Sequence, residues 1–357
     1  MNKDTSTYNE MIRGVWMDLF RIVLKKTNKR KYSNSPGRDV IMVLLFVFLL
    51  PYVISCLWGH VGEESAILFR RTESEKEWID ENYEVEIIGQ WGKKRLSMQD
   101  YLVEKLEMVM PKETESGILY EPEALKAQAV LLRTQLWSAI VSDREDGDGT
   151  SVTLQDDAFF HWEENPLTWE EECLYREAVC ETDGIYLSYE GKPVKAAFFP
   201  ISNGRTRNAS EVMPGENYPY FAGTECERDL FASEYQSRLC VSKREYCRLM
   251  REIFDTDATE EALWDSLELS YDSAEYVMSV KWNGRSCSGE IFRDVFGLNS
   301  SSFRMEWGEE EVTFYVRGVG HGLGMSQYGA NEKAVSGDTF DQILQDYFFQ
   351  AELVKIE

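Results

Sequence analysis

The sequence predicts an α+β protein with a strand-rich extracytoplasmic body, packed helices and a groove, preceded by one transmembrane helix. Strand-like runs alternate with helical segments after residue 83, and an uncharged stretch interrupts the N-terminal part. Forty-three per cent of the chain is hydrophobic, which is enough to build a packed core. We therefore divide the chain into a head (1–39), a membrane helix (40–59), a linker (60–82) and a folded domain (83–357).

Charge is unevenly distributed along the chain and predicts its orientation. Residues 1–39 hold nine Lys/Arg and four Asp/Glu, residues 40–59 hold none, and residues 60–357 hold 29 Lys/Arg and 59 Asp/Glu. The uncharged stretch is long enough to span a bilayer and lacks the polar stripe of a buried helix in a soluble protein. Its basic flank places the head in the cytoplasm and the body outside. The net charge of −25 argues against nucleic acid as a partner.

An alternative anchor is a lipid on Cys56, because Val53-Ile54-Ser55-Cys56 resembles a lipoprotein cleavage box. We expect Cys56 to remain unmodified, since the segment before the apolar stretch is unusually long for a signal peptide. The body holds six further cysteines, whose pairing the sequence leaves open. They are Cys173, Cys180, Cys226, Cys240, Cys247 and Cys287.

The body begins with short strands near 85–88 and 95–96. Ser97 and Asp100 form a capping box that opens a helix, and Pro111 ends it. The strongest helix covers 121–140, with Pro122 in its first turn. We expect a helix over 169–180, two strands over 183–200, a long loop over 208–232 and mostly helix over 242–268. Strands over 276–283 and 312–317 and a helix from about 339 complete the domain.

The helix over 121–140 has two distinguishable faces. An apolar stripe predicts the core-facing side and consists of Leu125, Ala129, Leu132, Leu136 and Ile140. Lys126 and Arg133 are seven residues apart and share another face. They are either solvated or available to an anionic ligand.

Glycines at every second position from Gly318 to Gly324 are the most specific signal in the chain. In extended structure they would leave one face without side chains, so that a long ligand can approach the backbone. The alternative is a tight structural turn. His321, Ser326, Gln327 and Tyr328 add a base, a hydroxyl, an amide and a phenol, a polar set suited to a sugar.

Other chemistries find less support in the sequence. A Ser/His hydrolase using Ser326 lacks the G-x-S-x-G elbow. Zinc at His161, Cys173 and Cys180 would lack both a common spacing and a fourth ligand. We therefore expect neither a metal nor another cofactor.

Four segments resemble the stage II sporulation protein D family, which includes the LytB-type amidase enhancer. They are EALKAQAVLLRTQ (123–135), DGIYLSYEGKPVKAAFFPISNGRT (183–206), YPYF (218–221) and GVGHGLGMSQYGANEKA (318–334). The resemblance spans roughly residues 83–350 and implies a lytic transglycosylase of peptidoglycan. Such an enzyme cuts the MurNAc–GlcNAc bond of peptide-free glycan strands during engulfment, with an amidase partner and a membrane partner.

The resemblance implies a set of residues that contact the glycan. These are Lys126, Arg133, Ser202, Asn203, Gly320, His321, Gly322, Ser326, Gln327 and Tyr328. It also implies one catalytic glutamate directly before Met110-Pro111, where this chain has Val109. Glu113 is the first candidate for a substitute acid and Glu107 the second. The alternative is a non-catalytic protein that binds glycan or organises a complex.

Overall fold

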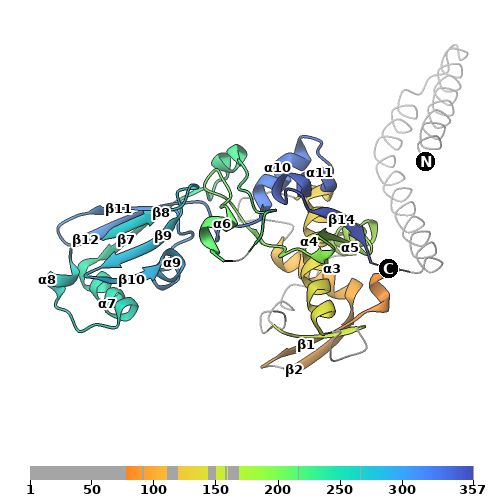
Figure 1. Ribbon diagram of the computed structural model, residues 1–357, viewed down its shortest axis with the longest axis horizontal. Coiled ribbons are helices and arrows are strands. Elements are labelled where there is room, and N and C mark those ends of the chain that lie inside the picture. The colour runs from red at the N-terminus through yellow and green to blue at the C-terminus, as the bar shows by residue number, and fades with distance from the viewer. Residues whose placement is uncertain are drawn as a thin grey trace, which may run out of the picture. The chain divides into compact units, whose positions relative to one another are not determined.

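The computed structural model describes residues 78–356, except 91, 111–119, 144–149, 157–158, 160–168, 216 and 266. They belong to one compact unit, Glu77–Glu357. The predicted head, the predicted span over 40–59, Cys56 and most of the linker lie outside the described residues. Among the residues described, no helix combines the length and the apolar character needed to cross a membrane. The described unit has a mixed α+β architecture, as predicted (Figure 1).

The first sheet has the order β2-β1-β3 and is preceded by a 3-10 turn, η1 (Asp80–Asn82). Strand β1 (Glu84–Gly89) runs antiparallel to β2 (Gly92–Ser97) and parallel to β3 (Ser151–Gln155). Helix α3 (Met98–Val109) begins where predicted, because the Ser97 hydroxyl accepts a hydrogen bond from the backbone N–H of Asp100 at 3.1 Å. Helix α5 (Trp169–Glu181) packs against α3 and α4.

Helix α4 (Pro122–Asp143) contributes to two hydrophobic cores and confirms the strongest sequence prediction. The predicted apolar stripe is buried in one core, together with residues of β1, α3 and α5. Ala127, Val130 and Leu131 are buried in a second core on another side of the helix. Because α4 packs on both sides, little of its surface remains for solvent.

The second core is closed by elements from distant parts of the chain. Strand β4 (Ile185–Tyr189) pairs with β5 (Lys192–Pro193) and with β14 (Glu352–Lys355). Strand β6 (Phe198–Phe199) pairs in parallel with β13 (Met325–Ser326), which leads into α10 (Gln327–Val335) and α11 (Phe340–Tyr347). These pairings bring the segment 197–203 beside the glycine run.

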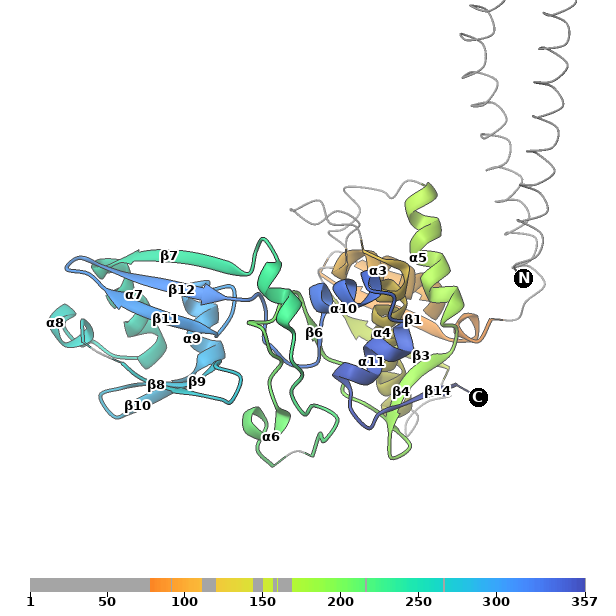
Figure 2. The same ribbon diagram turned by 90° about the horizontal axis from the view of Figure 1, so that it is seen from above.

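Residues 236–317 form an inserted lobe between β6 and β13, with a core of its own. It follows the short helix α6 (Ala209–Val212) and η3 (Glu227–Phe231), which packs against α10. One sheet has the order β10-β9-β8 and the other β11-β12-β7. Its strands are β7 (Gln236–Ser242), β8 (Glu268–Tyr271), β9 (Val277–Trp282), β10 (Arg285–Ser288), β11 (Phe303–Trp307) and β12 (Glu311–Arg317). Its helices are α7 (Lys243–Phe254), α8 (Glu260–Leu263) and α9 (Gly289–Phe296), as Figure 2 shows.

Candidate functional site

The glycine loop, residues 318–324, connects β12 to β13 and crosses the segment 197–203. Its four glycines have φ values of 74°, 103°, 79° and 78°, so the run is not extended and the predicted bare strand face is wrong. A Cβ atom on Gly324 would lie 2.0 Å from the Ala197 carbonyl oxygen, and one on Gly318 would lie 2.7 Å from that of Ile201. The glycines permit close backbone packing, the structural alternative that the sequence left open.

His321 projects from the glycine loop and borders two hollows. One has a volume of about 190 Å³ and is shared with Arg207 and Glu290; the other, about 410 Å³, is shared with Lys195 and Phe198. We call these two spaces the His321 hollows. None of the glycines at 318–324 lines them. The prediction that these glycines form the floor of a groove is therefore not met, whereas His321 does face open space.

The imidazole of His321 is held in a defined orientation. Its Nδ1 accepts a hydrogen bond from the backbone N–H of Leu323 at 3.1 Å, and its ring lies 5.5 Å from that of Phe199. Burial lowers the pKa of His321, and the negative charge of Glu290 partly opposes this effect. The ring is therefore neutral at pH 7 and suited to hydrogen bonding with sugar hydroxyls.

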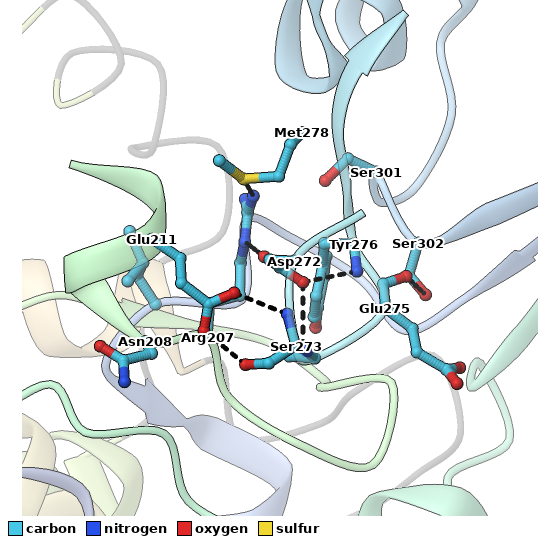
Figure 3. A network of polar contacts seen from close by, with 12 residues as sticks. Arg207, Asn208, Glu211, Asp272, Ser273, Glu275, Tyr276, Met278, Ser301 and Ser302 are labelled. Carbon is cyan, nitrogen blue, oxygen red and sulfur yellow. Dashed lines mark hydrogen bonds and ion pairs between the residues drawn. The ribbon is translucent and has the colours of Figure 1, made fainter. Parts of the chain in front are cut away.

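Arg207 joins the glycine loop to the inserted lobe, a role for which no local sequence pattern is a signal. Its Nε donates to Asp272 at 2.6 Å, and its Nη1 donates to Glu290 at 3.0 Å and to the His321 carbonyl at 3.3 Å. The guanidinium also lies 5.0 Å from the centre of the Tyr276 ring. Figure 3 shows Arg207, Asp272 and Tyr276 converging. Arg207 precedes Asp272 by 65 residues, too far along the chain for any spacing rule to connect the two.

Glu290 is the carboxylate that shares a hollow with His321. Its Oε1 accepts hydrogen bonds from Arg207 at 3.0 Å and Ser301 at 2.6 Å, and its Oε2 accepts one from Arg293 at 2.9 Å. Both oxygens are occupied by donors. This geometry suits a residue that holds the wall of the hollow in place rather than one that delivers a proton to a substrate.

Val109, where the resemblance predicts a catalytic glutamate, is contacted through its backbone by Gln327. The Nε2 of Gln327 donates to the Val109 carbonyl at 3.0 Å and to the side-chain oxygen of Gln128 at 3.2 Å. Gln327 is 3% exposed, so it connects α3 to α4 instead of facing a groove as predicted. The Nε2 of Gln128 is buried without a hydrogen-bond partner among the described residues.

Three further predicted contacts lie in the interior. Ser326 is fully buried and donates to Asp229 at 2.6 Å, and the backbone N–H of the buried Ser202 donates to the same carboxylate at 2.7 Å. Burial raises the pKa of Asp229, although these hydrogen bonds act in the opposite direction. Asn203 donates to Ala274 at 2.7 Å and connects to the inserted lobe. Because Ser326 bonds to an aspartate and not to a histidine, the Ser/His hydrolase is excluded.

The two cations on α4 are both engaged with protein partners. Arg133 is 0% exposed and binds Asp80, with distances of 2.9 Å from Nε to Oδ1 and 2.6 Å from Nη2 to Oδ2. We therefore withdraw Arg133 as a ligand contact, since a glycan cannot reach it. Lys126 pairs with Glu123 at 2.6 Å and with Glu181 at 2.5 Å.

The remaining candidates are less well placed. Glu107 is buried on α3 with 9% of its surface exposed, and Glu113 lies outside the described residues. Tyr328 is half-buried beside Ile201 and Tyr235, where burial raises its phenol pKa. His161 also lies outside the described residues, and within them no group of three or more His, Cys, Asp or Glu stands close enough to hold a metal. The six cysteines of the body are free thiols.

By sequence the chain is similar to stage II sporulation proteins, which confirms the resemblance described above. A family model described as "Stage II sporulation protein" matches residues 91–189, a range that contains Val109 and Gln128. The chain is 27% identical to stage II sporulation protein D of Bacillus subtilis (strain 168) over 262 residues, which cover 71% of this chain and 73% of that protein.

Two further relatives match most of the chain. Stage II sporulation protein D of Bacillus amyloliquefaciens is 28% identical, over 71% of this chain and 73% of the relative. The amidase enhancer of Bacillus subtilis (strain 168) is 23% identical over 68% of this chain but only 39% of its own length.

Proposed function

We propose that this chain is a cell-wall protein of sporulation that binds peptidoglycan glycan strands whose stem peptides have been removed. One observation carries the proposal: His321 stands between two hollows, while the position of the family's acid is occupied by Val109. Glu290, the carboxylate described beside His321, has both oxygens bound by protein donors, so the site offers binding groups rather than a free acid. The similarity to stage II sporulation protein D and to an amidase enhancer supports a role in the sporulation cell wall.

The chemistry of the His321 hollows suits a chain of alternating sugars. Phe198 supplies an aromatic surface, Gln135 and Ser138 supply hydrogen-bonding groups, and the neutral His321 imidazole adds another. Lys195 is exposed at the same hollow and is positioned to attract the carboxylate of a muramic acid. We therefore assign to Lys195 the role expected of Arg133, which is to attract an anionic group of the glycan.

Binding by the parent protein is tested with purified residues 60–357 and peptide-free glycan strands in a sedimentation assay. We expect Lys195→Gln to weaken binding several-fold at low salt and to have no effect at about 1 M salt, where exposed charges are screened. Lys192→Gln, an exposed lysine on the neighbouring turn, serves as the matched control. A parent protein that fails to sediment with the strands contradicts the proposal.

Cleavage of the glycan strand is the second candidate function. The position of Glu113 in the sequence favours it. Glu113 follows Val109 by four residues, close enough in the chain to bring a carboxyl to the leaving oxygen of a glycosidic bond. Incubation with peptide-free strands and mass spectrometry for anhydro ends tests this, with Glu113→Gln as the variant. Anhydro ends that disappear only in Glu113→Gln support cleavage, and their absence from the parent supports binding alone.

The proposal includes a membrane anchor over 40–59 with the head in the cytoplasm, and an amidase and a membrane protein as partners. The charge distribution supports the anchor. Protease treatment of spheroplasts tests the orientation: the body is expected to be digested and an epitope on the head protected. Fatty-acid labelling that is lost in Cys56→Ala would instead support a lipid anchor.

A further inference from the structure

The sheet of the inserted lobe with the order β11-β12-β7 has one buried face and one open face. Val312, Phe314 and Val316 of β12 are buried in the lobe's core. Because side chains alternate along a strand, Tyr315 and Arg317 project from the opposite face. Figures 1 and 2 both place α7 and α9 on the same side of this sheet. In the part of the chain that the structure describes, no helix covers the other side.

Two arginines flank one tyrosine across the open face. Tyr315 on β12 is paired with Arg304 on β11 and with Arg238 on β7. The guanidinium carbon lies 4.3 Å from the centre of the Tyr315 ring for Arg304 and 5.7 Å for Arg238. Both arginines are exposed, and neither has an ion pair among the described residues. Their positive charges are therefore not neutralised by the protein.

This face is also concave. A hollow of about 640 Å³ is lined by Arg304, Tyr315, Arg317 and Tyr271, among others. Tyr271 is 50% exposed and adds an aromatic surface to this hollow. Arg317 pairs with Glu275 at 2.7 Å, and Figure 3 shows Glu275 pointing away from the Arg207 cluster. We call Arg238, Arg304, Arg317, Tyr271 and Tyr315 the outer face.

The charge of the outer face contrasts with that of the whole chain, which carries −25. Glu275 is the acidic residue among those lining the hollow. Arginine forks bind carboxylates through two parallel hydrogen bonds, and their planar geometry specifies the anion. Exposed tyrosine rings offer flat apolar surfaces on which the C–H face of a sugar can lie. Together these groups match a sugar that carries a carboxylate.

We propose that the outer face is a second binding site for the glycan strand, which recognises the carboxylates of its muramic acid residues. This inference rests on the proposed function. It adds a site on the inserted lobe to the His321 hollows, so that one long strand or two neighbouring strands can be held. The carboxylate makes the site selective for peptide-free muramic acid, because a stem peptide converts that carboxylate to an amide.

The test compares peptide-free glycan strands with chitin oligosaccharides of the same length, which lack the carboxylate. Arg238→Gln/Arg304→Gln is expected to weaken binding of the glycan strands about tenfold at low salt and to leave chitin binding unchanged. Arg304→Lys with Arg238 intact should give a smaller loss, because it keeps the charge and removes the fork. The matched control is Arg244→Gln/Arg248→Gln, which removes two exposed arginines from α7 in the same lobe.

The outcomes separate this inference from the proposed function. Unchanged strand binding by the outer-face variant, or an equal loss in the α7 control, overturns the second site and leaves the proposed function standing. A parent protein that binds neither polymer contradicts both. A loss seen with a phosphodiester wall polymer but not with glycan strands overturns the assignment to carboxylate. The melting temperature of each variant is compared with that of the parent protein. Equal values show that a loss of binding does not come from a loss of folding.

Discussion

Replacing Arg133 by methionine is expected to destabilise the body by about 3–5 kcal/mol, the usual result of breaking a buried ion pair. Arg133 is 0% and Asp80 1% exposed, and the guanidinium contacts both carboxylate oxygens. It also donates to the carbonyls of Val179 and Ile185 at 3.2 Å each. Without Arg133, Asp80 retains a hydrogen bond from Gly184 at 3.3 Å, which is too little for a buried charge.

The change in the free energy of unfolding is measured by unfolding residues 60–357 in urea, with tryptophan fluorescence as the signal. The double variant Arg133→Met/Asp80→Asn should recover part of the loss, because it removes the uncompensated charge along with its partner. Arg248→Met, on an exposed face of α7, is the control and should leave the midpoint unchanged.

The result that would refute this reasoning is specific. If Arg133→Met keeps its stability and loses glycan affinity only at low salt, the guanidinium contacts ligand and the buried pair is not as described. A salt-independent loss of affinity that follows the loss of stability supports the buried pair, since screening acts weakly on an interior interaction.

Three other predictions concern the candidate site. Val109→Glu should raise the yield of anhydro ends from peptide-free strands by on the order of 10²–10⁴-fold over an inactive parent, because this is the usual contribution of general acid–base catalysis. The yield is measured by mass spectrometry. A variant that still binds the strands but produces no anhydro ends would contradict this prediction. Gly324→Ala should lower the free energy of unfolding in urea by more than ~2 kcal/mol, because its Cβ would lie 2.0 Å from the Ala197 carbonyl oxygen. Gly337→Ala has open space around its Cβ and should lower the same free energy by about 1 kcal/mol. Stability should fall as the pH drops through about 6.5, because unfolded His321 takes up a proton that the folded state, with its lowered pKa, does not bind; His321→Gln should show a smaller fall.

The sequence predicted those parts of the fold that local patterns encode. The start of α3 at Ser97 and the whole of α4 follow from capping chemistry, proline at the first turn and the apolar stripe. The sequence did not predict that α4 would be buried on two sides. Ala127, Val130 and Leu131 are buried on the second side, whereas the sequence predicted only one core-facing stripe and left the face of Arg133 to solvent or a ligand.

The candidate site was predicted less completely, because its groups come from distant segments. Arg207 meets Asp272 and Glu290 across 65 and 83 residues of chain. The alternation of glycines was visible, but the sign of φ was not: the same spacing fits an extended strand and a loop whose Cβ positions are filled by neighbours. His321 borders two hollows although burial lowers its pKa, a combination that the glycine spacing alone could not predict.

The contacts at Val109 are compatible with either a valine or the acid that the resemblance predicts at this position. Gln327 binds the backbone carbonyl of Val109 at 3.0 Å, and a backbone contact does not depend on which side chain the residue carries. The Val109 side chain packs at the margin of the first core, so a valine gains apolar contact where a carboxyl would be partly desolvated. Exchanging one for the other therefore changes the chemistry of the site without requiring α3, α4 or α10 to move. For this reason we expect glycan binding and cleavage to be separable at this single position.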